Sequence, residues 1–267
     1  MNCNYRRAHI IGNWKTSKTP LQTIEYIKTL KSLMPRTKNY EVGLCVPPVS
    51  ICDARRTSRE VRIHVGVENC QLNEEAAYTG ELPAEMLSGV GVKYVLLGHS
   101  ERRALGETDK NINFKVKAVL NADMRPVICV GEAENHREND VAFEWVALQV
   151  KLALAGIPAA LMGRVIFVYE PICDKGVEAV VTPERAAEMC AWIRKVIRQK
   201  YKIDGGGVIS RKVSILYGGY ITEENAEEFL SQADIDGALV GTTSLDVNKF
   251  SKIIETASRL NKLSATE

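Results

Sequence analysis

VIFVYEP, residues 165–171, is an apolar run that ends in a glutamate followed by a proline. Its β-branched and aromatic residues predict a short strand, and the lack of alternation with polar residues predicts that both faces of this strand are buried. Strands buried on both faces are typical of parallel sheets that are covered by helices. Glu170 stands at the carboxyl end of this predicted strand, which is where parallel barrels assemble their active sites.

Similar strand candidates recur along the whole chain, and longer stretches with helical periodicity separate most of them. The other seven candidates are AHIIGN (8–13), EVGLCV (41–46), RIHVGVE (62–68), YVLLG (94–98), RPVICVG (125–131), KVSILYG (212–218) and GALVG (237–241). Eight strands in 267 residues predict a closed α/β barrel, a (β/α)8 fold that typically needs about 250 residues. No linker divides the chain, so we expect one domain that spans residues 1–267.

An open, doubly wound sheet is the alternative architecture for this alternation of strands and helices. Such a sheet usually has a glycine-rich phosphate turn after its first strand. This chain has GNWK (12–15) at that place, which favours the barrel.

Several helices can be bounded from local signals. Residues 182 and 183, a threonine and a proline, predict the start of one helix, and Thr222 predicts the start of another. The glycine-rich stretch 204–212 is predicted to be a loop. The stretch 21–34 predicts an amphipathic helix, whose apolar face contains Leu21, Ile24, Ile27, Leu30, Leu33 and Met34.

The composition limits the classes of partner. The chain has 35 basic and 33 acidic residues, so its formal charge of +2 gives no reason to expect nucleic acid or an anionic membrane as a partner. Seven cysteines without a CxxC pair favour free thiols over disulfides or a zinc site. The apolar run near the N-terminus is too short for a secretion signal or a membrane span, so we expect a cytoplasmic protein.

Polar side chains follow three of the predicted strands. Glu170 ends one strand, His99 follows another, and Asn13 and Lys15 end the first. A carboxylate, an imidazole and an ammonium that converge there are suited to removing a proton beside a carbonyl group. Each has a plain structural reading as well: a salt bridge for Glu170, a structural histidine for His99, and an outward-pointing lysine for Lys15.

Glycines after the last two strands complete the pattern. Gly218–Gly219 and Gly241 allow backbone N–H groups to approach a ligand closely. Phosphate sites are common after strands 7 and 8 of such barrels. The sequence therefore predicts a phosphorylated substrate, although turns use glycine for many other reasons.

The chain resembles the triosephosphate isomerase family over nearly its whole length. The segments that carry the resemblance are GNWK, GELPAEMLSGVGVKYVLLGHSERR, PVICVGE, VYEP, ILYGG, ENAEEFLSQADIDGALVG and SLD. The resemblance implies a TIM barrel and a homodimer that interconverts dihydroxyacetone phosphate and glyceraldehyde 3-phosphate. It also implies that the enzyme uses neither a metal nor an organic cofactor.

The resemblance assigns roles to five residues. It implies that Glu170 is the base and that His99 is the neutral electrophile that polarises the carbonyl group. It implies further that Lys15 stabilises the oxyanion, that Asn13 hydrogen-bonds the substrate and that Glu101 orients the site.

The resemblance also assigns the substrate phosphate to backbone N–H groups. These would come from Gly176, from Gly219 and from the turn Gly241–Thr242, with Tyr220 beside them. The segment QLNEEAAYTGE, residues 71–81, resembles the family's interdigitating dimer loop. A plain surface loop is the alternative reading of that segment.

The chain departs from the family pattern around the phosphate. Cys173 stands where the family has a tryptophan at the hinge of its lid, and Glu178 stands where it has a glycine. Asp174 and Lys175 add charge to the tip of that loop, although a lid works by excluding water.

Two further departures lie in the phosphate turns. Tyr220 stands where the family has a serine, and Thr242 stands where it has a second glycine. These changes keep two alternatives open: a paralogous isomerase for a tetrulose phosphate such as L-erythrulose 1-phosphate, and a non-catalytic barrel that binds a phosphorylated metabolite.

Overall fold

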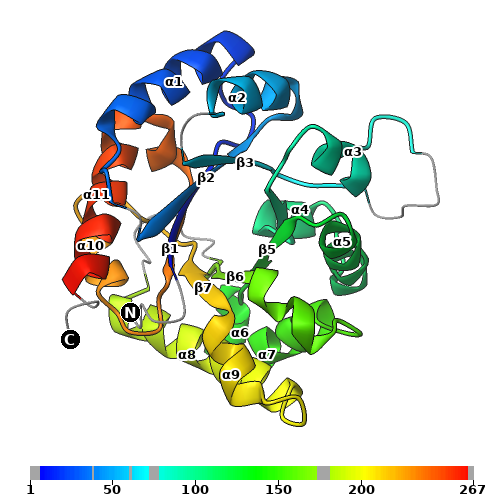
Figure 1. The fold of residues 1–267 in the computed structure, drawn as a ribbon. Coiled ribbons are helices and arrows are strands. Elements are labelled where there is room, and N and C mark those ends of the chain that lie inside the picture. The colour runs from blue at the N-terminus through cyan, green and yellow to red at the C-terminus, as the bar shows by residue number, and fades with distance from the viewer. Residues whose placement is uncertain (1–6, 38, 60–61, 72–77, 173–180, 264–267) are drawn as a thin grey trace.

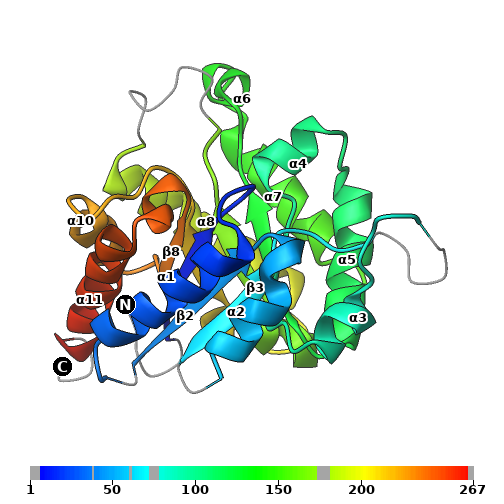
Figure 2. The same cartoon turned by 90° about the horizontal axis from the view of Figure 1, so that it is seen from above.

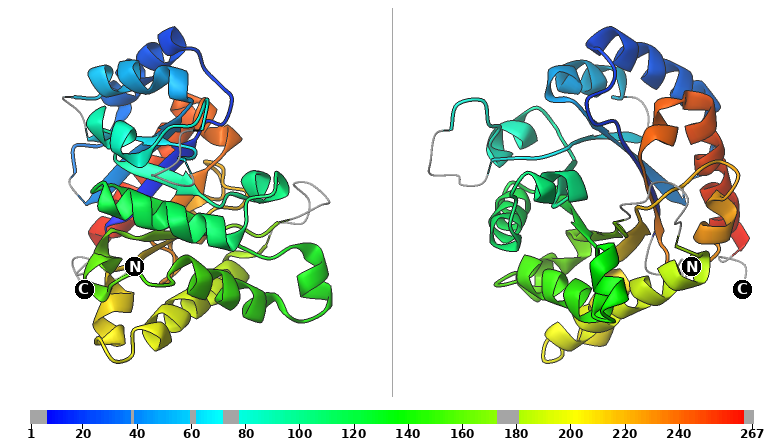
Figure 3. Two further views of the ribbon diagram at one scale, coloured as in Figure 1. Left: turned by 90° about the vertical axis from the view of Figure 1, so that its right-hand side faces the viewer. Right: turned by 180° about the vertical axis from the view of Figure 1, so that it is seen from behind.

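Eight parallel strands close into one barrel with helices around it (Figures 1 and 3). The structure is a computed structural model that describes residues 7–37, 39–59, 62–71, 78–172 and 181–263. The strands are β1 (Ala8–Asn13), β2 (Tyr40–Val46), β3 (Ile63–Val67), β4 (Tyr94–Leu97), β5 (Arg125–Val130), β6 (Ile166–Tyr169), β7 (Ser214–Tyr217) and β8 (Gly237–Val240). Each strand pairs with its neighbour in sequence, and β1 also pairs with β8. The predicted closed barrel is confirmed, and the open sheet is excluded.

The strands build two separate apolar layers because successive side chains point to opposite faces. One layer fills the barrel and consists of Ile11, Cys45, Tyr94, Leu96, Val127, Cys129, Ile166, Val168, Leu216 and Leu239. The larger layer lies between the strands and the helices and includes Ile10, Val42 and Phe167. The barrel is therefore a packed core rather than a pore, and it leaves room for a ligand only at its ends.

The helices pack on the outside of the barrel, as the view from above shows (Figure 2). The first set consists of α1 (Pro20–Leu33), α2 (Ile51–Thr57), α3 (Ala84–Gly89), α4 (Ser100–Ala104), α5 (Asp109–Asn121), α6 (Glu134–Glu138) and α7 (Ala142–Ala153). The second set consists of α8 (Pro183–Lys200), α9 (Gly206–Lys212), α10 (Ala226–Leu230) and α11 (Val247–Leu263). Short 3-10 turns are η1 (Pro48–Ser50), η2 (Ala159–Arg164) and η4 (Thr242–Leu245).

The helix signals in the sequence have mixed outcomes. Helix α8 begins at Pro183 as predicted, and the Thr182 side chain caps it by accepting a hydrogen bond from the Arg185 amide. In α1 the predicted apolar face is wrong at both ends, because Leu21 is 65% and Leu33 is 41% exposed, while Ile27 and Leu30 between them are fully buried. The face that packs on the barrel instead includes the polar Thr23 and the ring of Tyr26, whose hydroxyl group donates to the Ser244 carbonyl at 2.6 Å.

Two predictions downstream of α8 are corrected. Residues 206–212, predicted as loop, form the helix α9, in which Ile209 and Ser210 are buried. The glycines there serve close packing, since a Cβ on Gly206 would lie 2.1 Å from the Arg198 carbonyl oxygen. Helix α10 begins at Ala226 rather than just after Thr222, because residues 223–225 form turns first.

In the part of the chain that the structure describes, no helix combines the length and the apolar character that a membrane crossing requires.

Candidate active site

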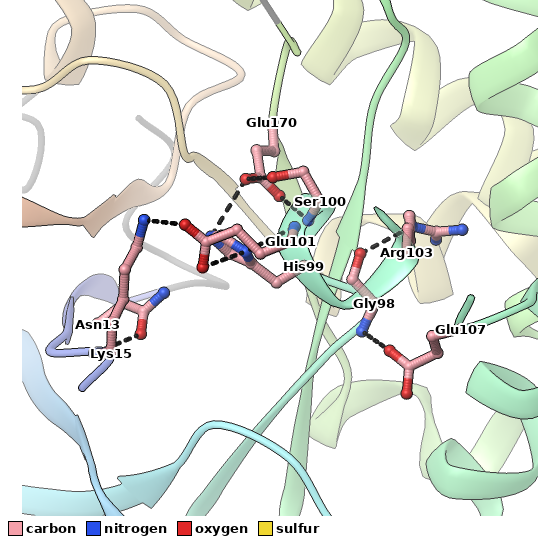
Figure 4. A network of polar contacts seen from close by, with 9 residues as sticks. All are labelled: Asn13, Lys15, Gly98, His99, Ser100, Glu101, Arg103, Glu107 and Glu170. Atoms are coloured by element: carbon pink, nitrogen blue, oxygen red, sulfur yellow. Dashed lines mark hydrogen bonds and ion pairs between the residues drawn. The ribbon is translucent and has the colours of Figure 1, made fainter. Parts of the chain in front are cut away.

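A cavity of about 390 Å³ opens at the carboxyl ends of the strands. It collects every predicted site residue that lies in the described ranges. These are Asn13, Lys15, His99, Glu101, Glu170, Gly219, Tyr220, Gly241 and Thr242. The first five come from the ends of three strands, β1, β4 and β6, and each of them contacts another of the five or Ser100 (Figure 4).

Glu170 is held beside the cavity by one neighbouring serine. The Ser100 hydroxyl donates to Glu170 Oε1 at 2.6 Å, and the Ser100 amide donates to Oε2 at 3.1 Å. The Glu170 side chain is 12% exposed. The sequence analysis missed Ser100, although its position between His99 and Glu101 in the HSE motif is a signal that identifies it.

His99 faces the same carboxylate. Its Nε2 lies 3.2 Å from Glu170 Oε1, and its Nδ1 accepts a hydrogen bond from the Glu101 amide at 3.3 Å. A backbone amide can only donate, so Nδ1 carries a lone pair and the proton of the neutral ring is on Nε2. The imidazole therefore presents an N–H group to the cavity and to Glu170.

The turn that carries His99 is fixed by two charged side chains. Gly98 has a φ of +69°, which favours glycine, and its amide donates to Glu107 at 3.2 Å. Arg103 donates to the Gly98 carbonyl at 2.7 Å (Figure 4). It also donates to the Cys129 carbonyl at 3.1 Å, which ties the end of β4 to β5. This support keeps the imidazole in place relative to β6.

Lys15 lies across the cavity from Glu170. It forms an ion pair with Glu101, and its amide donates to the Asn13 side-chain oxygen at 3.3 Å. Its φ is +54°, a left-handed conformation that costs a residue with a Cβ about 1 kcal/mol or more. The strained backbone and the buried Asn13 together direct the ammonium group toward the cavity.

The backbone of Glu170 is closely packed against the end of β5. A Cβ on Gly131 would lie 1.9 Å from the Glu170 carbonyl oxygen, so only glycine fits there. The Glu170 amide donates to the Val130 carbonyl at 2.9 Å. Two residues further on, Ile172 donates its amide to the Glu132 carbonyl at 2.9 Å and accepts from Arg137 at 2.7 Å.

Glu132 anchors this arrangement from a fully buried position. Its Oε1 accepts from Arg137 at 3.0 Å and from the Tyr169 hydroxyl at 2.9 Å. Burial, followed by the Glu132 charge, raises the pKa of Tyr169 far above its ordinary value, so the phenol stays a donor. These residues were not predicted, because nothing in the local sequence around Glu132 marks its contact with β6.

The two glycine turns line the other side of the cavity. A Cβ on Gly219 would lie 2.2 Å from the Tyr217 hydroxyl oxygen, so this glycine permits a close approach of backbone and ring. Gly241 precedes η4, and its carbonyl accepts from the Ser244 amide at 2.9 Å. Tyr220 is half-exposed and Thr242 is exposed, and both line the cavity.

Some predicted residues cannot be placed. Gly176 and the departures at Cys173, Asp174, Lys175 and Glu178 lie outside the described residues, as do positions 72–77 of the predicted dimer loop.

Glu68 is a second carboxylate that the sequence analysis missed. It lines a separate hollow of about 360 Å³ beside Lys15 and His99. Its Oε1 is buried and has no hydrogen-bond partner among the described residues. Burial raises the pKa of Glu68 to about 8. A hydrogen bond from the Lys15 backbone opposes this shift, and the neighbouring Glu101 charge adds to it.

Among the residues that the structure describes, no group of three or more histidine, cysteine, aspartate or glutamate side chains is arranged to hold a metal ion. The described cysteines are free, and Cys45, Cys70, Cys129 and Cys190 are buried.

Comparisons with known proteins agree on one family. The family model described as triosephosphate isomerase matches residues 8–257. A triosephosphate isomerase from Lactobacillus acidophilus is 37% identical over 250 residues, which cover 93% of this chain and 98% of that protein. One from Carboxydothermus hydrogenoformans is 38% identical over 251 residues, covering 94% and 98%. The crystal structure of triosephosphate isomerase from Bartonella henselae superposes with a TM-score of 0.82 at 30% identity and covers 94% and 98% of the two chains.

Proposed function

Because the chain belongs to the triosephosphate isomerase family and is an enzyme of that type, we propose that Glu170, His99 and Lys15 carry out the isomerisation. The reaction interconverts dihydroxyacetone phosphate and glyceraldehyde 3-phosphate, a step of glycolysis. The observation that supports these roles is the convergence of Glu170 and His99 Nε2, 3.2 Å apart, on a cavity that Lys15 also lines.

The Glu170 carboxylate removes a proton from C1 of dihydroxyacetone phosphate. The C–H electron pair forms the C1–C2 double bond, and the carbonyl π pair moves onto O2 to give an enediolate. The protonated Glu170 then returns the proton to C2, which gives the aldehyde. A positioned carboxylate base typically contributes about 10²–10⁴-fold to the rate of such a step.

His99 donates its Nε2 proton to O2 and recovers a proton from the O1 hydroxyl group. Without substrate, this N–H group points at Glu170. A substrate carbonyl oxygen therefore competes for the donor, and the carboxylate is freed to reach carbon. Lys15 and Asn13 stabilise the charge on O2, and a donor of this kind is worth about 3–4 kcal/mol in the transition state. Glu101 holds Lys15 through the ion pair.

Backbone N–H groups of Gly219 and of the turn Gly241–Thr242 bind the substrate phosphate, with Gly176 as a further donor. The described groups line the same cavity as Glu170, and glycine leaves their amides accessible. Tyr220 lies at the edge of this phosphate site.

The altered residues favour one alternative substrate. Tyr220 and Thr242 line the cavity where smaller residues are expected, which alters the space around the substrate's periphery rather than around the base. A tetrulose phosphate, isomerised by the same enediol chemistry, is the alternative that these two side chains suggest.

A parallel assay tests both substrates. Purified protein is given triose phosphates and L-erythrulose 1-phosphate, with Glu170→Ala as the inactive variant and Glu188→Gln, an exposed change on α8, as the matched control. We expect triose turnover that Glu170→Ala abolishes and Glu188→Gln retains. Turnover on the four-carbon substrate alone supports the alternative, and turnover that survives Glu170→Ala contradicts the proposed base.

We also propose that the chain acts in the cytoplasm as a homodimer through residues 71–81. The hollow beside Lys15 is bordered by Pro48, by the end of this segment at Gly80 and Glu81, and by Leu105, whose side chain is 79% exposed. Its position beside residues 80–81 and its exposed apolar border support a contact with the same segment of a second copy. The molar mass of the Leu105→Asp variant in solution tests this contact. We expect it to fall to that of one subunit, and a molar mass equal to that of the unchanged protein argues against the contact.

A further inference from the structure

Helix α7 carries apolar side chains on the face that points away from the barrel. Val141, which precedes the helix, is 41% exposed, Trp145 is 38% exposed, Leu148 is 46% exposed and Leu152 is 40% exposed. We call these four residues the α7 stripe. A surface helix usually has polar residues on this face, so a contiguous apolar row there indicates an interaction surface.

The spacing of the α7 stripe is that of a helix packed against another helix. Its members are four, three and four residues apart, the alternation that places side chains in one row along a helix and that also occurs in helix–helix seams. The opposite face of α7 is already buried against the barrel through Val146 and Val150. The helix is therefore apolar on both sides, and the barrel covers only one of them.

Charges beside the α7 stripe are arranged with opposite signs at its two ends. Glu144 lies in the first turn of α7 and Lys151 in the last, and both are exposed. Neither forms an ion pair within the described part of the chain. A second helix with the same sequence, running antiparallel, would set each Glu144 against the Lys151 of the other copy.

We propose that two copies of this chain associate through the α7 stripe, with their α7 helices antiparallel around a two-fold axis at Leu148. A two-fold interface uses the same patch on both subunits, so each contact occurs twice. In this register the two Leu148 side chains meet, and Trp145 packs against Leu152 of the second copy. The two Glu144–Lys151 pairs flank the seam and determine its direction.

The anchor of this contact is held in place before association. The Trp145 ring stacks on the His136 ring, with centroids 4.2 Å apart and an angle of 18° between the planes. A large ring with a fixed orientation loses little conformational entropy on binding, and such tryptophans carry much of the binding energy of interfaces. The net charge of +2 adds little repulsion between copies.

The neighbouring helix α5 carries one further exposed aromatic side chain. Asn113 of α5 donates to the Ala153 and Ala155 carbonyls at 2.9 Å, which holds α5 against the end of α7. The next residue, Phe114, is 47% exposed. Since α7 is only about 18 Å long, the buried area is modest and we expect association to depend on protein concentration.

Analytical ultracentrifugation over a wide concentration range tests the proposal. We expect the mass of the unchanged protein to double as concentration rises, whether or not the proposed dimer contact at residues 71–81 also forms. Leu148→Asp should raise the dissociation constant of this association about 100-fold or more. Val208→Asp, an equally exposed apolar site on α9, is the matched control and should leave it unchanged.

A charge exchange tests the antiparallel register. Glu144→Lys and Lys151→Glu should each weaken the doubling, because each places like charges side by side, and the double variant should restore it. Isomerase activity reports correct folding in every variant. A protein whose mass does not double at any concentration overturns the proposal and leaves the surface to another protein, and doubling that Leu148→Asp does not affect overturns it as well.

Discussion

Histidine and glutamate side chains face each other at both ends of the barrel, yet only one end has the geometry of a catalytic site. At the carboxyl end, Glu170 and His99 border a cavity of about 390 Å³. At the amino end, Glu41 lies among His9, His64, Tyr94 and Arg125. The two carboxylates are similarly shielded, with 12% of Glu170 and 18% of Glu41 exposed.

The difference lies in how many partners each carboxylate has. Glu41 Oε2 accepts from the Tyr94 hydroxyl at 2.8 Å and from Arg125 at 3.3 Å, and His9 lies 3.7 Å away. Burial alone raises the pKa of Glu41, but the contacts with His9, Tyr94 and Arg125 outweigh it and leave that pKa below its ordinary value. Glu170 has serine and histidine donors and an open space in front of it. A carboxylate that is surrounded by hydrogen-bond and ion-pair partners stabilises the fold. A carboxylate that has fewer partners and borders a cavity can accept a proton from a substrate.

The largest expected effect is at the open end. Glu170→Gln keeps the shape of the side chain but removes the base, so we expect the kcat to fall about 10³-fold, with a small change in KM. Steady-state kinetics on triose phosphates measures this. A loss below tenfold means that another group removes the proton.

The matching change at the amino end is expected to alter stability instead. Glu41→Leu leaves Arg125 and Tyr94 without their shared acceptor, and we expect a loss of about 3 kcal/mol in the free energy of unfolding. The kcat of the folded fraction should stay the same. Urea unfolding together with kinetics distinguishes the two ends, and a large drop in kcat with unchanged stability refutes the distinction.

The pH dependence of stability sharpens the comparison further. Burial, assisted by Arg125, lowers the pKa of His9 from 6.5 to about 3. Between these values the unfolded chain binds a proton that the folded chain does not, so stability is present above pH 6.5 and is lost as pH falls toward 3. We expect a slope of up to about 1.4 kcal/mol per pH unit. His9→Gln should flatten this slope in urea unfolding between pH 7 and 5, and an unchanged slope argues that His9 is not its source.

The smallest expected effect is at Glu68, where the change of stability with pH has the opposite sign to that at His9. Its raised pKa of about 8 means that the folded chain holds a proton there after the unfolded chain has released it, so this group lowers stability as pH rises from 4.5 through 8. Glu68→Gln has no carboxylate to ionise, so it removes the cost of a partly buried negative charge and should stabilise the protein by about 1 kcal/mol above pH 8. Thermal unfolding at pH 6 and 9 measures this gain, which should be larger at the higher pH.

The sequence predicted a parallel sheet because its strands are apolar runs that are buried on both faces, and the number of strands together with GNWK after the first of them favoured the barrel over an open sheet. It also predicted which strand ends carry the polar side chains, since Glu170 and His99 directly follow such runs. It did not predict Glu68 or Glu132, because their roles depend on contacts between residues far apart in the chain, whereas Ser100 was missed although the HSE motif places it between two predicted site residues. The glycines in residues 204–212 led to the prediction of a loop. These residues instead include helix α9, and Gly206 is required for close packing against Arg198.

The chain on either side of residues 173–180 is fastened to the barrel. The Ile172 amide donates to the Glu132 carbonyl, and the Ile172 carbonyl accepts from Arg137. On the other side of the segment, the Thr182 side chain caps α8. Ile172 and Thr182 are therefore suitable positions at which to join an exchanged segment in an engineered chain. The intervening segment can be exchanged as a cassette between homologous enzymes, so that its influence on substrate choice is measured on one unchanged barrel.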